Sequence, residues 1–136
     1  GLPDLVGRLA ALPGVDDLAL TTNATLLPRL AVPLREAGLQ RGSISLHSLD
    51  EQVFLAMNGE RLTVERVLEG VEAADRAGLG PIKLNCVVQR GVNDHTLVAL
   101  ADRFRGRLQY VHENSHAARP AGRCHSNNPD RFHRYR

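Results

Sequence analysis

Two hydrophobic periods alternate along the first hundred residues, and this alternation is what most limits the folds open to the chain. The clearest helix is predicted at 63–77, where Val64, Val67 and Val71 fall on one stripe. The same patterns predict further helices at 2–12, 26–37, 51–57 and 93–104, and strands at 17–23, 42–47, 81–89 and 108–111. Asn93 and Asp94 offer a cap for the start of the last helix. Such alternation predicts an α/β fold with about four parallel strands and covering helices, which suits part of a barrel or a doubly wound sheet.

Three of the predicted strands carry polar side chains on one face and aliphatic side chains on the other. A parallel sheet with helices on both sides usually has strands that are apolar throughout, so a polar face indicates a barrel with a wet interior. In such barrels the carboxyl ends of the strands carry the chemistry. We therefore expect six polar side chains around one cavity: Thr21, Asn23, Ser45, His47, Lys83 and Asn85.

Lys83 is the most informative of these residues, because it is the only lysine of the chain and stands inside an apolar strand. A buried ammonium group needs an anionic partner, which a phosphate or carboxylate ligand would supply. The alternative is an edge-strand lysine that faces water. Asn85 shares the face of Lys83 and favours the ligand. His47 has no defined partner in the sequence, and Cys86 is expected to be a small core side chain.

The charge is unevenly distributed along the chain. The net charge is +2, but residues 1–105 carry 11 basic and 13 acidic side chains, while 106–136 carry six arginines and two acids. The basic segment has no lysine and no helical period, so we do not expect nucleic-acid binding. We predict a folded domain at 1–113 and a tail at 114–136 that is disordered or read out of frame from GC-rich DNA.

The sequence shows no signal for a membrane or for export. No apolar run approaches the roughly 20 residues that a membrane-spanning helix needs. The first residues lack the basic and apolar regions of a signal peptide. Cys86 and Cys124 are 38 residues apart, which suggests neither a disulfide framework nor a metal cluster. We therefore expect a cytoplasmic protein with no membrane partner.

Several runs resemble the radical-SAM (S-adenosylmethionine) GTP 3′,8-cyclase family of molybdenum cofactor biosynthesis. The resemblance covers about residues 1–111. It is carried by the runs from Leu18 to Asn23, Leu34 to Leu39, Ser43 to Asp50, Met57 to Gly59, Val67 to Gly70, Lys83 to Asn85 and Gln89 to Asp94. It implies a partial (β/α)₆ barrel resembling a TIM barrel, of which this chain supplies roughly strands three to six.

The resemblance also implies an activity and its cofactors. In the family a 4Fe-4S cluster reduces S-adenosylmethionine, and the resulting radical abstracts hydrogen from the ribose of GTP. The product is (8S)-3′,8-cyclo-7,8-dihydroguanosine 5′-triphosphate, and the enzyme is a lyase. By resemblance Ser45 and Asn85 contact S-adenosylmethionine, and Thr21 and Lys83 bind GTP. The intact enzyme is expected to be a homodimer.

The sequence also departs from the family pattern. The cysteine motif that binds the cluster would lie before Gly1, so we expect an internal fragment that holds no metal and is inactive alone. Ala24 stands where the family usually has glycine, and His47 where it has aspartate. Gln109 replaces an arginine. In the family a second, C-terminal cluster helps bind the purine, and Cys124 has no partners at the spacing of that cluster.

Two alternatives remain open. The chain could belong to another radical-SAM enzyme that acts on a peptide or a small molecule. It could also be a truncated half-barrel that binds ligand without turnover.

Overall fold

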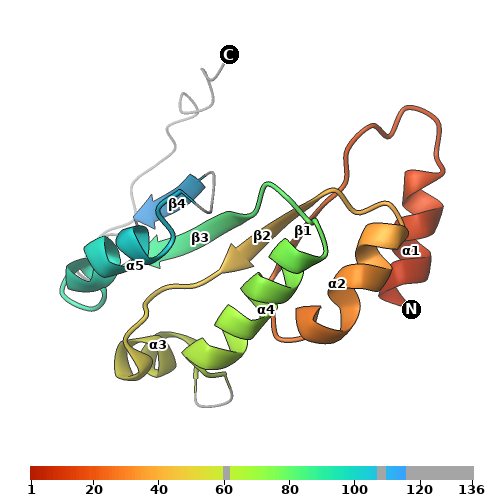
Figure 1. Ribbon diagram of the computed structural model, residues 1–136. Helices are drawn as coiled ribbons and strands as arrows, with labels where there is room; N and C mark the ends of the chain where they lie inside the picture. Colours follow the sequence, from red (N-terminus) through yellow and green to blue (C-terminus); the bar gives the residue numbers. More distant parts are fainter. Residues whose placement is uncertain (60–61, 107–109, 116–136) are drawn as a thin grey trace, which may run out of the picture.

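Strands and helices alternate along the chain and build one parallel sheet (Figure 1). The computed structural model describes residues 1–59, 62–106 and 110–115. The strands pair in the order β1-β2-β3-β4, and each pair is parallel, which confirms the predicted α/β class. The strands are β1 (Ala19–Thr22), β2 (Arg41–Ser45), β3 (Lys83–Val88) and β4 (Tyr110–Ser115). The helices are α1 (Leu2–Ala10), α2 (Leu27–Glu36), α3 (Glu51–Asn58), α4 (Val64–Arg76) and α5 (Leu97–Arg103), with a 3-10 turn, η1 (Asp94–Thr96), before α5.

Two predicted elements differ from the structure. The helix predicted at 93–104 begins as the η1 turn and becomes α-helical only at Leu97, and Asn93 does not cap it with its side chain. The strand predicted at 108–111 is β4, which ends at Ser115. It therefore runs two residues past the predicted domain boundary at 113. The rest of the predicted tail, residues 116–136, lies outside the described residues.

Side-chain caps fix the starts of α3 and α4. The Asp50 carboxylate accepts a hydrogen bond from the Val53 amide at 3.0 Å, and the Thr63 hydroxyl accepts one from the Arg66 amide at 3.3 Å. Each bond satisfies an amide that has no partner within its helix. The Glu51 carboxylate accepts a further bond from the Val64 amide at 3.0 Å. This bond ties the start of α3 to the start of α4.

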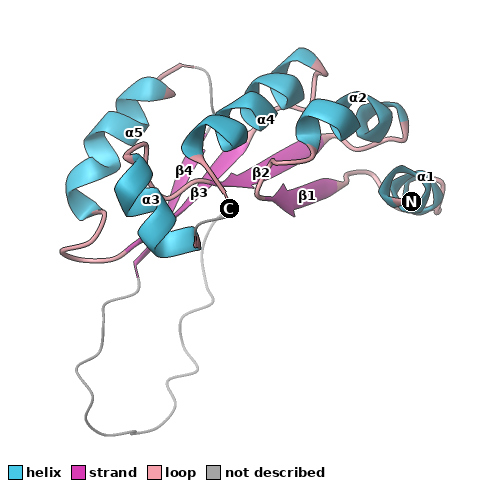
Figure 2. Ribbon diagram, turned by 90° about the horizontal axis from the view of Figure 1, so that it is seen from below, coloured by secondary structure: helices cyan, strands magenta, loops and turns pink. Residues whose placement is uncertain are grey.

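The helices α2, α4 and α5 lie over one face of the sheet (Figure 2). Burial along β2 and β3 alternates between buried and half-buried residues after the exposed Arg41, as the sequence predicts. The buried residues face the helices and form the core: Ile44, Leu46, Leu84 and Cys86 from β2, β3 and the residue after β2, and Leu34, Phe54, Val67 and Leu100 from the helices. Full burial of one such large side chain contributes about 1.5–3 kcal/mol. No helix of the described part covers the opposite face.

A close contact places α4 against the loop that follows β1. A Cβ atom added at Gly70 would lie 2.6 Å from the Cβ and 2.8 Å from the carbonyl carbon of Ala24. Ala24 is fully buried and has a φ of 66°, in the left-handed region that favours glycine. Only a glycine at position 70 lets the helix approach this loop so closely. The contact therefore fixes the distance between α4 and the end of β1.

We predict that Gly70→Ala lowers the free energy of unfolding by about 3 kcal/mol, because overpacking at a rigid contact costs about 1–3 kcal/mol and here the neighbour is main chain. Gly42→Ala is the matched control, because a Cβ added in the middle of β2 meets no atom within 4 Å. We expect the control to be neutral or stabilised by about 0.5 kcal/mol. Chemical denaturation of the two variants and the parent chain measures the difference. Equal stabilities of the two variants would contradict the packing.

Candidate functional site

Strand pairing aligns four of the six predicted site residues, together with Ser43, into two rows on the side of the sheet that no described helix covers. In the first row Thr21 is the register partner of Ser43, and Ser43 is the partner of Lys83. In the second row Ser45 is the partner of Asn85. Neighbouring strands lie about 4.8 Å apart, so the members of a row are close enough to contact one ligand together. We define these five residues as the polar face.

Lys83 is half-buried at the start of β3. It forms no ion pair with any described residue, whereas Arg41 on the same side of the sheet is paired with Asp17. Arg66 and Arg76 on α4 are paired in the same way with Glu69 and Glu72. An ammonium group that is partly removed from water and has no carboxylate beside it favours an anion. The side chain is thus suited to hold a phosphate or a carboxylate.

Asn23 was predicted to lie with the other polar side chains, but it is not part of the polar face. It follows the end of β1, and its side-chain oxygen accepts hydrogen bonds from the amide of Thr25 at 3.3 Å and from the hydroxyl of Thr25 at 2.8 Å. Asparagine commonly binds its own main chain two residues further on in this way, which builds a tight turn. Asn23 therefore shapes the loop before α2, and its side-chain oxygen already accepts hydrogen bonds from Thr25.

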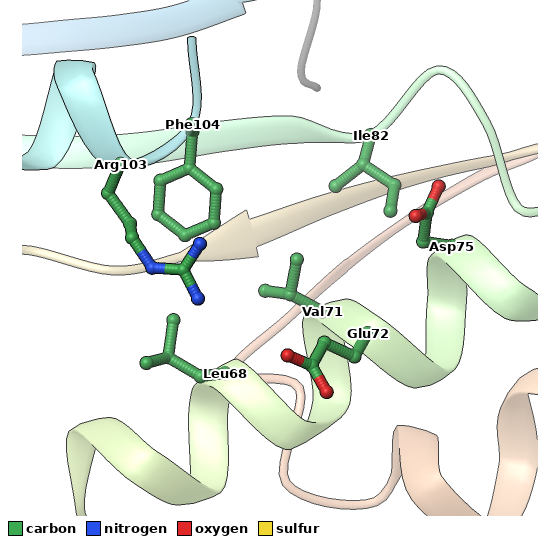
Figure 3. A pocket seen from close by; sticks show the side chains of 7 residues that line it. All are labelled: Leu68, Val71, Glu72, Asp75, Ile82, Arg103 and Phe104. Atoms are coloured by element: carbon green, nitrogen blue, oxygen red, sulfur yellow. The ribbon is translucent and has the colours of Figure 1, made fainter. Parts of the chain in front are cut away.

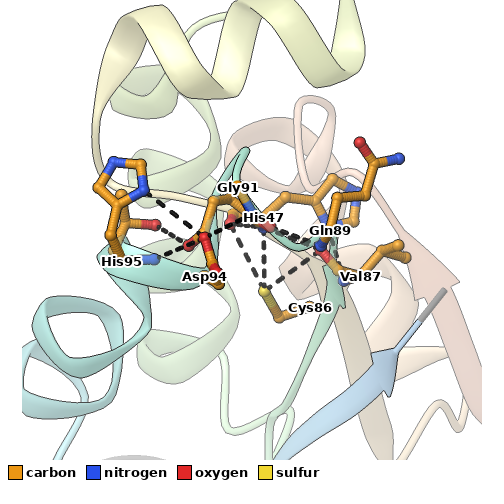
Figure 4. Close-up of polar contacts among 9 residues, drawn as sticks. His47, Cys86, Val87, Gln89, Gly91, Asp94 and His95 are labelled. Carbon is orange, nitrogen blue, oxygen red and sulfur yellow. Dashed lines mark hydrogen bonds and ion pairs between the residues drawn. The ribbon is translucent and has the colours of Figure 1, made fainter. Parts of the chain in front are cut away.

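His47 lies beyond the end of β2, and its imidazole binds the neighbouring strand (Figure 4). Its Nδ1 accepts a hydrogen bond from the amide of Val87 at 3.1 Å. The β2–β3 register ends at Ser45 and Asn85, so the ring continues the pairing by one bond where the main chain of β2 no longer does. Burial lowers the pKa of His47, because the charged ring is disfavoured away from water. A protonated Nδ1 could not accept the Val87 bond.

Asn93 is the residue that sequence reasoning assigned to the wrong role. It was expected to cap a helix, but it is fully buried and joins the ends of β2 and β3. Its amide nitrogen donates to the carbonyls of His47 at 2.7 Å and Val87 at 2.9 Å, and its oxygen accepts from the amide of Gln89 at 2.8 Å. Three main-chain groups thus depend on one side chain. The sequence contains no signal that turns this asparagine inward.

Cys86 takes the core position predicted for it. It is buried on the side of β3 that the helices cover, and its thiol donates to the carbonyl of His47 at 3.5 Å. Within the described residues, no group of three or more His, Cys, Asp or Glu side chains could hold a metal ion. The described residues therefore do not supply the ligands of an iron–sulfur cluster, and Cys124 lies outside them. The polar face itself carries hydroxyl, amide and ammonium groups.

A pocket on the other side of the sheet is separate from the polar face (Figure 3). It lies between α4, β3 and the end of α5 and is lined by Leu68, Val71, Glu72, Asp75, Ile82, Arg103 and Phe104. The Arg103 guanidinium lies 5.8 Å from the centre of the Phe104 ring. The pocket shares no residue with the polar face.

Among the helices that the structure describes, none is long and apolar enough to cross a membrane.

The lowered pKa of His47 predicts that stability falls in mild acid. The unfolded chain binds a proton on this ring near pH 6.5, and the folded chain binds it only at lower pH. The contribution of His47 is therefore complete above about pH 6.5 and is lost as the pH falls towards the folded pKa. His47→Asn keeps an acceptor for Val87 and cannot titrate. We expect denaturation at pH 7.5 and 5.5 to show a smaller loss in the variant, and equal losses would contradict the assignment.

Comparison with known proteins identifies the family. The family model of the radical SAM superfamily matches residues 2–104. A protein named GTP 3′,8-cyclase from Xanthomonas axonopodis pv. citri is 50% identical over 105 residues, which are 77% of this chain and 31% of that protein. Proteins of the same name from Acidothermus cellulolyticus and Pseudomonas putida are 46% identical over 118 residues (87% of this chain, 31% of the relative) and 52% identical over 102 residues (74% and 30%). The chain thus spans less than a third of each relative. With most of its described residues inside the family model, this chain belongs to the radical SAM superfamily.

Proposed function

We propose that this chain forms part of the ligand-binding wall of a GTP 3′,8-cyclase, a lyase that converts GTP to (8S)-3′,8-cyclo-7,8-dihydroguanosine 5′-triphosphate. The observation that carries the proposal is the first row of the polar face, in which Thr21, Ser43 and Lys83 are register partners. The family match and the relatives named GTP 3′,8-cyclase support it. The chain covers less than a third of those relatives, so the rest of the wall would come from other parts of such an enzyme.

Lys83 suits the triphosphate of GTP in this proposal. Its ammonium group has no carboxylate partner among the described residues, and the hydroxyls of Ser43 and Thr21 lie beside it in the same row. An ammonium group binds phosphate as a point charge, and hydroxyl groups add directed hydrogen bonds. No helix of the described residues lies over this side of the sheet, and Thr21 is exposed there.

Ser45 and Asn85 suit S-adenosylmethionine, whose ribose and amino-acid groups need both donors and acceptors. A hydroxyl and a carboxamide each provide both. When bound, S-adenosylmethionine supplies the radical chemistry of this family. The 4Fe-4S cluster belongs to the proposal only through the family, because the described residues contain no suitable ligand set. The chain alone would accordingly bind ligands without turnover.

The setting of the activity is also a proposal. We place the intact enzyme in the cytoplasm, as a homodimer with GTP as its small-molecule substrate and with neither nucleic acid nor membrane as a partner. The polar face carries one positive side chain, Lys83, which suits one phosphate group of the triphosphate.

Titration of the 136-residue chain with GTP and with guanosine tests the proposal. A charge-assisted hydrogen bond contributes about 1.5–3 kcal/mol, so Lys83→Gln should weaken GTP binding about tenfold or more and leave guanosine binding unchanged. Arg66→Gln is the matched control, because this substitution removes the same charge from α4, which lies on the opposite side of the sheet from Lys83. Ligand-observed NMR measures both affinities. Equal weakening by the two variants, or none by Lys83→Gln, would overturn the assignment.

A further inference from the structure

A groove lies between α2 and α4, on the side of the sheet opposite the polar face. The two helices pack against each other and lie side by side in Figure 1 and in Figure 2. Three residues that line the groove are alanines: Ala31 on α2, Ala73 on α4 and Ala77 directly after α4. Ala73 and Ala77 are four residues apart and share one face of the helix. These small side chains leave a space of about 150 Å³ between the helices.

The charged residues that line this groove are both positive, Arg29 from α2 and Arg76 at the end of α4. Arg29 is exposed and forms no ion pair with any residue that the structure describes. Arg76 has one such partner, Glu72, at 3.8 Å, and the Arg76 side chain is 72% exposed. An ion pair in water at this distance contributes little to stability. Both guanidinium groups are therefore available to an anion.

The volume of the groove limits the size of its occupant. Sites for small molecules usually enclose about 300–1,000 Å³ and bury most of the ligand. The groove, at about 150 Å³, is smaller than this range. An apolar cavity of about 150 Å³ admits one benzene ring. The groove therefore suits a single apolar side chain that projects from a larger molecule, with negative groups beside it for the two arginines.

The place of the groove in the fold keeps it open when the sheet is extended. The helix α2 connects β1 to β2, and α4 belongs to the connection from β2 to β3, so the groove lies between two consecutive crossovers. Further strands pair only at the outer edges of β1 and β4. The chain spans less than a third of its relatives, and any strand–helix unit added to this sheet lies beyond those edges. Such units do not fill the groove.

We propose that the groove between α2 and α4 is a docking surface for an acidic segment of a partner protein. One apolar side chain of the segment fills the space beside the three alanines, and carboxylates next to it pair with Arg29 and Arg76. Charge complementarity selects this partner, because the groove lining contains two arginines and no acidic residue. Arginine clusters recognise acidic motifs, and arginine is enriched in protein interfaces. The proposal is independent of the cyclase activity, since the groove and the polar face lie on opposite sides of the sheet.

An NMR titration of the ¹⁵N-labelled 136-residue chain tests the proposal, with a synthetic peptide in which one leucine lies between glutamates as the probe. We expect the largest amide shifts at Ala31, Val32, Ala73 and Ala77, which line the groove. A second peptide, with glutamine in place of every glutamate, should bind about tenfold more weakly, because it keeps the leucine and loses both ion pairs. Equal affinities of the two peptides, largest shifts elsewhere, or no binding of the acidic peptide would overturn the proposal.

Three variants separate the charged part of the groove from its apolar part. Arg29→Gln changes an exposed side chain and should bind the acidic peptide about threefold to fivefold more weakly than the parent chain. Arg66→Gln is the matched control, because it removes the same charge from α4 and does not line the groove. Ala77→Leu fills the groove at unchanged charge and should weaken binding about tenfold. Equal effects of the two arginine variants would contradict the proposal, as would binding to phosphatidylserine vesicles without binding to the peptide.

Discussion

Burial of one side of the sheet under α2, α4 and α5 is the constraint on which the other features depend. Ile44 and Leu84 are fully buried against these helices, and strand alternation then turns their neighbours to the opposite side. The polar residues occupy that side because the helices leave it uncovered. The close contact between Gly70 and Ala24 sets how near α4 approaches the end of β1. Packing of the helices on one side of the sheet thereby positions the polar side chains on the other side.

The ends of β2 and β3 are held by side chains where regular pairing stops. The Val87 amide finds its acceptor in the His47 ring, and the carbonyls of His47 and Val87 find their donor in Asn93. Unpaired main-chain groups at this level would cost about 1–3 kcal/mol each. The network therefore stabilises the carboxyl ends of the strands, where ligands bind in barrels of parallel strands. It also gives His47 one tautomer and one orientation.

The fold was predictable because its elements follow simple hydrophobic periods. The stripe on α4 and the alternation along β2 and β3 predicted both the helices and the two sides of the sheet. The resemblance to the cyclase family also marked Ala24 as a departure from glycine. The structure shows why glycine is favoured at this position. The residue has a φ of 66°, a conformation that costs an alanine about 1–2 kcal/mol.

The network at the end of the sheet was not predictable, since it depends on distances across strands. Asn93 has the sequence context of a helix cap, and only the fold brings its amide to the His47 carbonyl. Asn23 likewise has the sequence context of a strand end that faces a ligand, but its side-chain oxygen accepts hydrogen bonds from Thr25. Local competition between a side chain and the nearby main chain decides the case of Asn23, whereas the case of Asn93 depends on a contact between residues far apart in the sequence. The hydrophobic periods of the sequence contain no information about these hydrogen-bond partners.

Mapping of backbone amide shifts on addition of GTP to the ¹⁵N-labelled chain tests the central claim most directly. The claim is that the uncovered side of the sheet, and not the pocket between α4 and α5, is the ligand-binding surface. It predicts that the largest shifts occur at Thr21, Ser43 and Lys83. Largest shifts at Leu68, Glu72 and Arg103, which line the pocket on the helix side, would contradict it.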